Sequence, residues 1–371
     1  MSAPEVHQLA TGIPITCHAF NKDRTQVAVS PNNNDVEIYQ KNRAGGWDLL
    51  HTLAKHDKLV TSIDWAPNTN RLVTCSQDRN AYVWDWDAKL GRWEASLCLL
   101  RINRAATFVK WSPKENKFAV ASGARLISVC YFEVENNWWV AKHIKKPIRS
   151  TVTSVDWHPD NILLAAGSTD MKARVFSAYV KGVDAQIPAP VWGEKLPFNT
   201  VCGEFSSASG AWVHSVAFSP SGNYVAFASH DSTVAIANGP NNPVVTIPTG
   251  GLPLVSIIFT SETSIVGVGH DCTPYLLAER NGQWEVVGKL DQGQKKAAAA
   301  SSAFKMFQQM DSRAQQSAPK VELNTTHQNT ITCVRPHTGA SDSVSKFSTS
   351  GVDGKLVIWD LLSSGLAGLK I

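Results

Sequence analysis

The stretch from His56 to Asp87, HDKLVTSIDWAPNTNRLVTCSQDRNAYVWDWD, contains three short strands and the turns that separate them. The first is apolar and rich in Ser and Thr, runs from Val60 to Trp65, and ends in an aromatic residue close to a proline. A second apolar strand leads to a tight turn at Asp78, and Ala81–Trp84 closes the unit. Short alternating runs with β-branched and aromatic side chains are typical of strands.

This pattern occurs seven times along the chain. The first strands are Ile15–Phe20, Val60–Trp65, Ala106–Trp111, Val152–Trp157, Val213–Phe218, Leu254–Phe259 and Ile331–Pro336. The turn residues are Asn33, Asp78, Arg125, Asp170, Asp231, Asp271 and Asp353. Six residues later the third strand closes at Tyr39, Trp84, Tyr131, Phe176, Ala237, Leu277 and Trp359. A fourth strand follows the turns at Trp47, Trp93, Trp138 and Trp284.

Four short antiparallel strands per repeat form one blade of a β-propeller, because a single such sheet cannot bury both its faces and stacked blades can. The first strands end 45, 46, 46, 61, 41 and 77 residues apart, so the two long spacings mark insertions. We therefore expect an all-β chain that forms one seven-bladed propeller over residues 1–371. The segment Glu5–Leu9 is predicted to complete the seventh blade and remove its open edge.

The second unit resembles the WD-repeat family. It carries His56, Ser62, Asp78 and Trp84 followed by Asp85, and the seventh unit carries the corresponding His327, Cys333, Asp353 and Trp359. In that family these positions form a hydrogen-bond relay that holds a blade together. A His beside an Asp also fits a catalytic or metal-binding pair, but the relay explains both occurrences without chemistry.

Five more specific stretches resemble the family of WD-repeat subunits of the actin-related protein 2/3 complex, which nucleates branched actin filaments. They are Ile15–Asn21, Pro31–Tyr39, Ser76–Trp84, Asn136–Val140 and Phe304–Phe307, and the resemblance covers essentially the whole chain. It implies a non-catalytic scaffold in the cytoplasm, at the actin cytoskeleton and cell cortex. Its implied partners are the other subunits of the complex, the actin filament, and nucleation-promoting factors with acidic tails.

The insertion at residues 292–319 differs in composition from the blades and is predicted to be a short helix that protrudes between blades six and seven. At about 100° per residue, the side chains of Phe304, Met306, Phe307 and Met310 fall within roughly 160° of arc. A short helix is marginal in water, so this one either folds back on the propeller or docks on a partner. The family resemblance implies contact with actin of the mother filament.

Two further segments are candidates for contact. Residues 178–197 include Pro188, Pro190 and Pro197 with Trp192, which predicts a stiff, extended insertion that serves as a contact loop or covers the surface. Lys145, Lys146 and Arg149 form a basic cluster, with Lys55 and Lys58 as a second. These cations either attract acidic partners, including the acidic tails implied by the resemblance, or belong to solvated loops.

Composition excludes several other functions. The formal net charge of +4 is too small to require nucleic acid, and neither a secretory signal nor an apolar stretch of membrane-spanning length is present, so we expect no membrane insertion. The seven cysteines are scattered without a C-x-x-C pair, which argues against disulfides or a zinc site in favour of a reducing cytosol. Phosphate-loop, dinucleotide and Gly-x-Ser-x-Gly motifs are absent, so we expect no cofactor, no metal and no enzyme. The alternatives are a propeller adaptor, such as a ubiquitin-ligase substrate receptor, and a propeller hydrolase.

Overall fold

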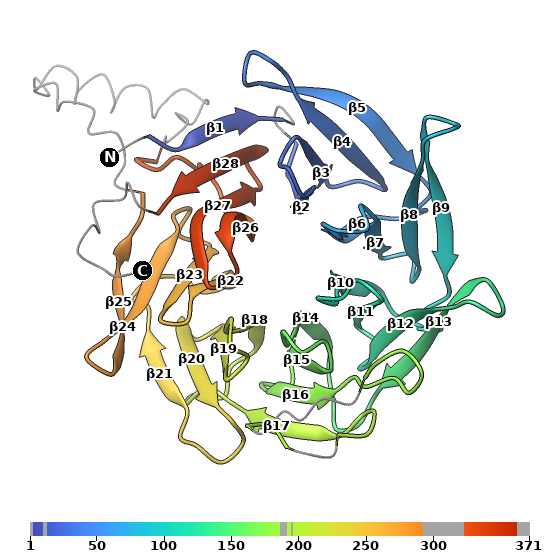
Figure 1. Cartoon of the computed structure of the whole chain (residues 1–371). Helices are drawn as coiled ribbons and strands as arrows, with labels where there is room; N and C mark the ends of the chain where they lie inside the picture. The colour runs from blue at the N-terminus through green and yellow to red at the C-terminus, as the bar shows by residue number, and fades with distance from the viewer. Residues whose placement is uncertain (1–2, 10–12, 186–190, 194–195, 292–322, 362–371) are drawn as a thin grey trace, which may run out of the picture.

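The computed structural model describes residues 3–9, 13–185, 191–193, 196–291 and 323–361. These residues form short antiparallel strands arranged as seven blades around a central channel (Figure 1). The predicted seven-bladed β-propeller is therefore confirmed. The described residues contain no helix, and hence none long and apolar enough to cross a membrane.

Blades one to five are separate four-stranded sheets, numbered in chain order. Blade one is β2 (Cys17–Phe20), β3 (Gln26–Ser30), β4 (Asp35–Lys41) and β5 (Trp47–Ala54). Blade two is β6 (Val60–Trp65), β7 (Leu72–Ser76), β8 (Ala81–Asp87) and β9 (Arg92–Cys98). Blade three is β10 (Ala106–Trp111), β11 (Lys117–Ser122), β12 (Ile127–Glu133) and β13 (Trp138–Ile144). Blade four is β14 (Val152–Trp157), β15 (Leu163–Ser168), β16 (Ala173–Ser177) and β17 (Val201–Phe205). Blade five is β18 (Val213–Phe218), β19 (Tyr224–Ser229), β20 (Thr233–Asn238) and β21 (Val245–Pro248).

Blades six and seven are joined into one eight-stranded sheet. Blade six is β22 (Leu254–Ser261), β23 (Ser264–Gly269), β24 (Tyr275–Arg280) and β25 (Gln283–Lys289). Blade seven is β26 (Ile331–Ala340), β27 (Ser343–Gly351), β28 (Lys355–Asp360) and the amino-terminal β1 (Glu5–Gln8). A single pairing between Ser261 of β22 and Ser343 of β27 connects the two blades.

The ring closes through the amino terminus, as the strand count predicts. β1 pairs antiparallel with β28, with Val6 opposite Val357. The first strand of blade one also contacts blade seven, because the Ile15 amide donates to the Gly351 carbonyl at 3.0 Å and the Thr332 hydroxyl donates to the Ile15 carbonyl at 2.8 Å. An exposed edge on the last blade is thereby avoided.

The hydrophobic core lies between neighbouring blades. Val73 and Val83 of blade two, for example, belong to the same buried cluster as Val109 and Phe118 of blade three. The second strands are buried along nearly their whole length, as in β7, β11 and β15, because each sheet buries both of its faces against its neighbours.

The insertion at 178–197 lies against the blades in its described parts. Trp192 is only 3% exposed, packs beside Phe205 and Phe218, and its indole N–H donates to the Gly222 carbonyl at 2.8 Å. These contacts favour the covering role over a free contact loop. The predicted helix at 292–319 falls outside the described residues.

Candidate functional site

The relay of blade two connects the loop before β6 to strands β7 and β8 through one buried hydroxyl. His56 Nδ1 lies 2.7 Å from Asp78 Oδ2, and His56 Nε2 lies 2.8 Å from Thr74 Oγ1. The Trp84 indole N–H donates to the same Thr74 oxygen at 3.0 Å. The hydroxyl between His and Trp is thus that of Thr74, and the assignment of Ser62 to the relay is wrong.

A β-bulge explains the error. The register between β6 and β7 shifts between Val60 and Ser62, which places Ser62 opposite Cys75 rather than Thr74. The Ser62 hydroxyl instead lies 3.5 Å from the Val109 carbonyl of the next blade. A one-residue bulge leaves no clear signal in the sequence, although the Leu-Val-Thr-Cys pattern at Leu72–Cys75 offers Thr74 as a second candidate.

Blade seven repeats the arrangement. His327 Nδ1 lies 3.0 Å from Asp353 Oδ1, His327 Nε2 lies 2.8 Å from Thr349 Oγ1, and the Trp359 indole N–H donates to that oxygen at 2.8 Å. Cys333 follows a bulge like that of Ser62, because the register of β26 shifts between Ile331 and Cys333. The second relay therefore also runs through the Thr of the second strand of its blade.

The relay histidines are unsuited to catalysis. Burial lowers the pKa of His56 more than its partner Asp78 raises it, so the ring is neutral at pH 7. Its Nδ1 then donates to the carboxylate and its Nε2 accepts from the Thr74 hydroxyl. Both ring nitrogens are occupied and His56 is only 3% exposed, so the relay holds the blade together rather than meeting a substrate.

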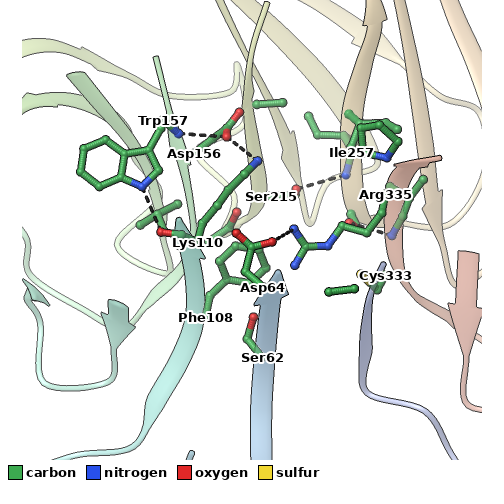
Figure 2. Close-up of a pocket in the computed structure, with 18 of the residues that line it drawn as sticks. Ser62, Asp64, Phe108, Lys110, Asp156, Trp157, Ser215, Ile257, Cys333 and Arg335 are labelled. Atoms are coloured by element: carbon green, nitrogen blue, oxygen red, sulfur yellow. Dashed lines mark hydrogen bonds and ion pairs between the residues drawn. The ribbon is translucent and has the colours of Figure 1, made fainter. Parts of the chain in front are cut away.

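The central channel contains a cavity of about 750 Å³ lined by the first strands of the blades (Figure 2). The residue before the strand-closing aromatic or Pro lines it in every blade: Ala19, Asp64, Lys110, Asp156, Ala217, Ile258 and Arg335. The charged members of this ring stand on blades two, three, four and seven, and the apolar members on blades one, five and six. The repeated motifs VTSIDW and VTSVDW contain the two carboxylates, and this repetition is the sequence signal that could have identified them.

The charged groups of the ring pair with one another. Arg335 reaches past blade one to blade two, where it donates to Asp64 at 3.1 Å and to the Ile63 carbonyl at 2.8 Å (Figure 2). Lys110 donates to Asp156 of the next blade at 2.5 Å. Burial by itself would lower the pKa of Arg335, but the charge of Asp64 outweighs burial and the net pKa is raised, so the guanidinium stays charged.

The two carboxylates also accept backbone hydrogen bonds from the following blade. Asp64 accepts the Trp111 amide at 2.7 Å, and Asp156 accepts the Phe218 amide at 2.7 Å. All four charged residues of this ring therefore stabilise contacts between blades. Within the described residues, no group of three His, Cys, Asp or Glu side chains is placed to hold a metal.

Lys145, Lys146 and Arg149 are exposed in the loop between blades three and four. The Arg149 amide donates to Asp170 at 2.8 Å, which fixes this loop beside the turn between β15 and β16. Equivalent backbone bonds tie the turns of blades two and three to the loops before those blades. The same end of the propeller therefore also carries exposed Lys55, Lys58, Arg79, Arg101, Arg104 and Arg125.

We call these nine residues the basic surface. None of the nine side chains forms an ion pair with another described residue. Two carboxylates at this end of the propeller are engaged elsewhere, Asp78 with His56 and Asp170 with Arg174, while the exposed Asp57 stands between Lys55 and Lys58 in the sequence. The surface is thus able to attract anions.

Comparison with known proteins agrees with this architecture. The model of the WD domain, G-beta repeat, matches residues 47–85, 142–177 and 200–238. "Actin-related protein 2/3 complex subunit 1A-B" of Xenopus laevis is 54% identical over 363 residues, which cover 96% of this chain and 97% of the relative. "Actin-related protein 2/3 complex subunit 1" of Schizosaccharomyces pombe is 47% identical over 93% of this chain and 96% of its own. "Actin-related protein 2/3 complex subunit 1B" of Arabidopsis thaliana is 41% identical over 97% of both chains.

The chain belongs to the family of actin-related protein 2/3 complex subunit 1. The family resemblance derived from the sequence is therefore confirmed. In this family member the structure brings together the relay residues and displays the basic surface. The residues Phe304, Met306, Phe307 and Met310 of the predicted inserted helix lie outside the described part.

Proposed function

We propose that this chain is a non-catalytic scaffold subunit of an actin-related protein 2/3 complex and supports the nucleation of branched actin filaments in the cytoplasm, at the actin cytoskeleton and cell cortex. The observation that carries the proposal is 41–54% identity over nearly the whole chain to proteins named as subunit 1 of that complex. The channel charges and relay histidines support a scaffold, since their contacts join strands and blades.

Purification of a tagged copy from cytosol tests this assignment. We expect two actin-related proteins and several smaller subunits to co-purify in equal amounts. A lone monomer, or components of a ubiquitin ligase in their place, would refute it while leaving the fold intact.

The basic surface supports a second part of the proposal, contact with the acidic tails of nucleation-promoting factors. Three exposed cations of this surface have no ion-pair partner among the described residues: Lys145, Lys146 and Arg149. Their electrostatic attraction for an acidic peptide is therefore not offset by an ion pair within the chain. In the assembled complex, the triple change to Glu should weaken binding of an acidic peptide and reduce its dependence on salt. Unchanged affinity and salt dependence would exclude this surface.

The inserted segment supports the third part, contact with the mother filament. Phe304, Met306, Phe307 and Met310 would supply a mixed Phe and Met face, which suits protein recognition. Complex that carries both Phe307→Asp and Met310→Asp should bind filaments less and form fewer branches. If filament binding and branching are unchanged, the segment does not contact actin.

A further inference from the structure

The turn between the second and third strands of a blade holds an Asp in five of the seven blades. In four of these turns the carboxylate accepts a backbone amide from the loop before the blade. The donor and acceptor pairs are Asp57 with Asp78 at 3.1 Å, Arg149 with Asp170 at 2.8 Å, Leu252 with Asp271 at 3.1 Å and Gln328 with Asp353 at 2.9 Å. A negative charge at this position therefore joins the loop to the turn.

Blade three has no carboxylate at this position. A shared backbone bond aligns blades two and three, because Gly123 donates to the Ala105 carbonyl at 2.9 Å as Gln77 donates to that of Leu59 at 3.0 Å. Ala124, and not the predicted Arg125, thus takes the place of Asp78. The Asn103 amide corresponds to that of Asp57 and has no acceptor among the described residues.

Cations gather around the turn that lacks the Asp. Residues 99–106, 122–127 and 144–152 form this end of blade three and contain six Lys or Arg and no Asp or Glu. Arg125 directly follows Ala124, and Arg104 packs against the same turn, since a Cβ atom at Gly123 would lie 3.3 Å from that of Arg104. Both arginines are exposed, and neither side chain forms a hydrogen bond or an ion pair with another described residue.

Arg101 and Lys145 extend this group toward the outer strand of the blade. The Arg101 guanidinium donates to the Ala141 carbonyl of β13, which fixes it beside that strand. Lys145 directly follows β13. Burial lowers the pKa of His143, and the charges of Arg101 and Lys145 lower it further, so both cations lie near this ring. We call the four cations Arg101, Arg104, Arg125 and Lys145, together with the Asn103 amide, the blade-three site.

The composition of the blade-three site favours phosphate groups over carboxylates. Three of its four cations are Arg, whose planar guanidinium donates two parallel hydrogen bonds to a phosphate. A phosphomonoester carries about −1.5 to −2 charges at neutral pH, so the four cations balance about two such groups. One phosphate oxygen can accept the Asn103 amide, as the turn Asp accepts the corresponding amide in four other blades.

We propose that the blade-three site binds a small anion that carries several phosphate groups, of the chemical class of the inositol polyphosphates. This group occurs free in solution and as the headgroup of membrane lipids, and the site recognises the chemistry that both share. The anion takes the part of the missing Asp and joins the loop before blade three to the turn of that blade. The inference depends only on described residues of this chain and does not rest on the proposed function.

Isothermal titration calorimetry of the full chain with inositol hexakisphosphate tests the proposal. In about 0.15 M salt, charges more than about 8 Å apart are largely screened, so the affinity reports contacts within the site. Ala124→Asp supplies the carboxylate of the other blades, which accepts the Asn103 amide in place of the ligand and repels phosphate. We expect this variant to raise the Kd about tenfold to a hundredfold, through the loss of a hydrogen bond to a charged group.

The matched control is Ala44→Asp, which makes the same change in net charge. Ala44 is exposed in the hairpin between β4 and β5, at the opposite end of the propeller, so the Kd should stay at the wild-type value. Ala124→Asp introduces a residue that five other blades hold, so the thermal midpoint should not fall. If it does fall, Arg104→Gln tests the same site at an exposed side chain and should also raise the Kd about tenfold or more.

A second variant separates phosphate recognition from general attraction to positive charge. Arg125→Lys keeps the charge and removes the guanidinium, so it should raise the Kd about tenfold, while Arg43→Lys in the β4–β5 hairpin should leave it unchanged. An unchanged Kd for Arg125→Lys would overturn the inference. So would an oligo-glutamate peptide of matching charge that binds as tightly as the polyphosphate and loses as much affinity in this variant.

Sedimentation with phosphatidylcholine vesicles distinguishes the two sources of the ligand. Binding only to vesicles that contain phosphatidylinositol bisphosphate, with loss of binding in Ala124→Asp, identifies a lipid headgroup. Binding of the soluble polyphosphate without vesicle binding identifies a free anion, and either result supports the inference. If neither ligand binds, or if Ala124→Asp and Ala44→Asp weaken binding equally, the blade-three site is refuted, and the assignment to the complex is unaffected.

Discussion

The substitution Thr74→Val removes one hydroxyl and leaves the shape of the side chain nearly unchanged. That hydroxyl accepts the Trp84 indole N–H at 3.0 Å and lies 2.8 Å from His56 Nε2, in a site closed to water. Two buried polar groups lose their partner at once, each at about 1–3 kcal/mol, so the unfolding free energy should fall by about 2–6 kcal/mol. For a chain of this size the thermal midpoint should fall by about 3–8 °C.

Calorimetry and urea unfolding of the full chain would measure the change. Thr74→Ser keeps the hydroxyl and should recover most of the loss. Ser62→Ala removes a contact of 3.5 Å and should cost less than about 1 kcal/mol. If Ser62→Ala is as destabilising as Thr74→Val, the relay does not run through Thr74 and the bulge argument is wrong.

Three other perturbations follow from buried contacts. His18 is neutral because burial holds its pKa well below the usual value. Its contribution to stability is therefore present above about pH 6.5 and is lost as pH falls, by up to about 1.4 kcal/mol per pH unit. Between pH 7 and 5, the unfolding free energy of His18→Leu should change less with pH than that of the wild type. Lys117→Met should cost about 3–5 kcal/mol because it strands Asp184, and adding Asp184→Leu should restore part of it in a double-mutant cycle. Removal of β1 exposes the edge of β28, and light scattering should show more aggregation of the truncated chain than of the full chain.

The blade architecture could be predicted because it is local in sequence. Each predicted first strand is a run of six residues that ends in an aromatic or Pro, and the structure places a strand at all seven of these positions. The fourth strands of blades four and five, β17 and β21, were not predicted, because no Trp follows the turn that precedes them. Tertiary pairing, not local propensity, orders those outer strands.

The functional details were less predictable because they depend on register and on closure of the ring. Ser62 and Thr74 are equally plausible from spacing, and only the bulge in β6 separates them. Arg335 and Asp64 are 271 residues apart in sequence, and the pair forms because seven blades close a circle.

A recurring hydrogen bond joins the first strands of neighbouring blades, and we call each such boundary between two blades a seam. The second residue of the first strand is Thr in five blades, and Thr16, Thr61, Thr107, Thr153 and Thr332 each donate to a carbonyl at the start of the next blade. In blades five and six that residue is His214 and Val255, so this bond is lost at both seams.

Contacts of other kinds also join neighbouring blades. At the seam between blades five and six, Glu262 accepts from the Ser219 hydroxyl at 2.9 Å and from the Ser221 amide at 3.0 Å. Glu115 accepts from the Asn68 and Thr69 amides in the same way between blades two and three, where the Thr61 bond is kept. At the seam between blades six and seven, Ser261 and Ser343 pair their strands directly. The Glu contacts lie at the opposite end of the first strands from the Thr bonds, so a seam that has both, such as that between blades two and three, is held at both ends of its first strands.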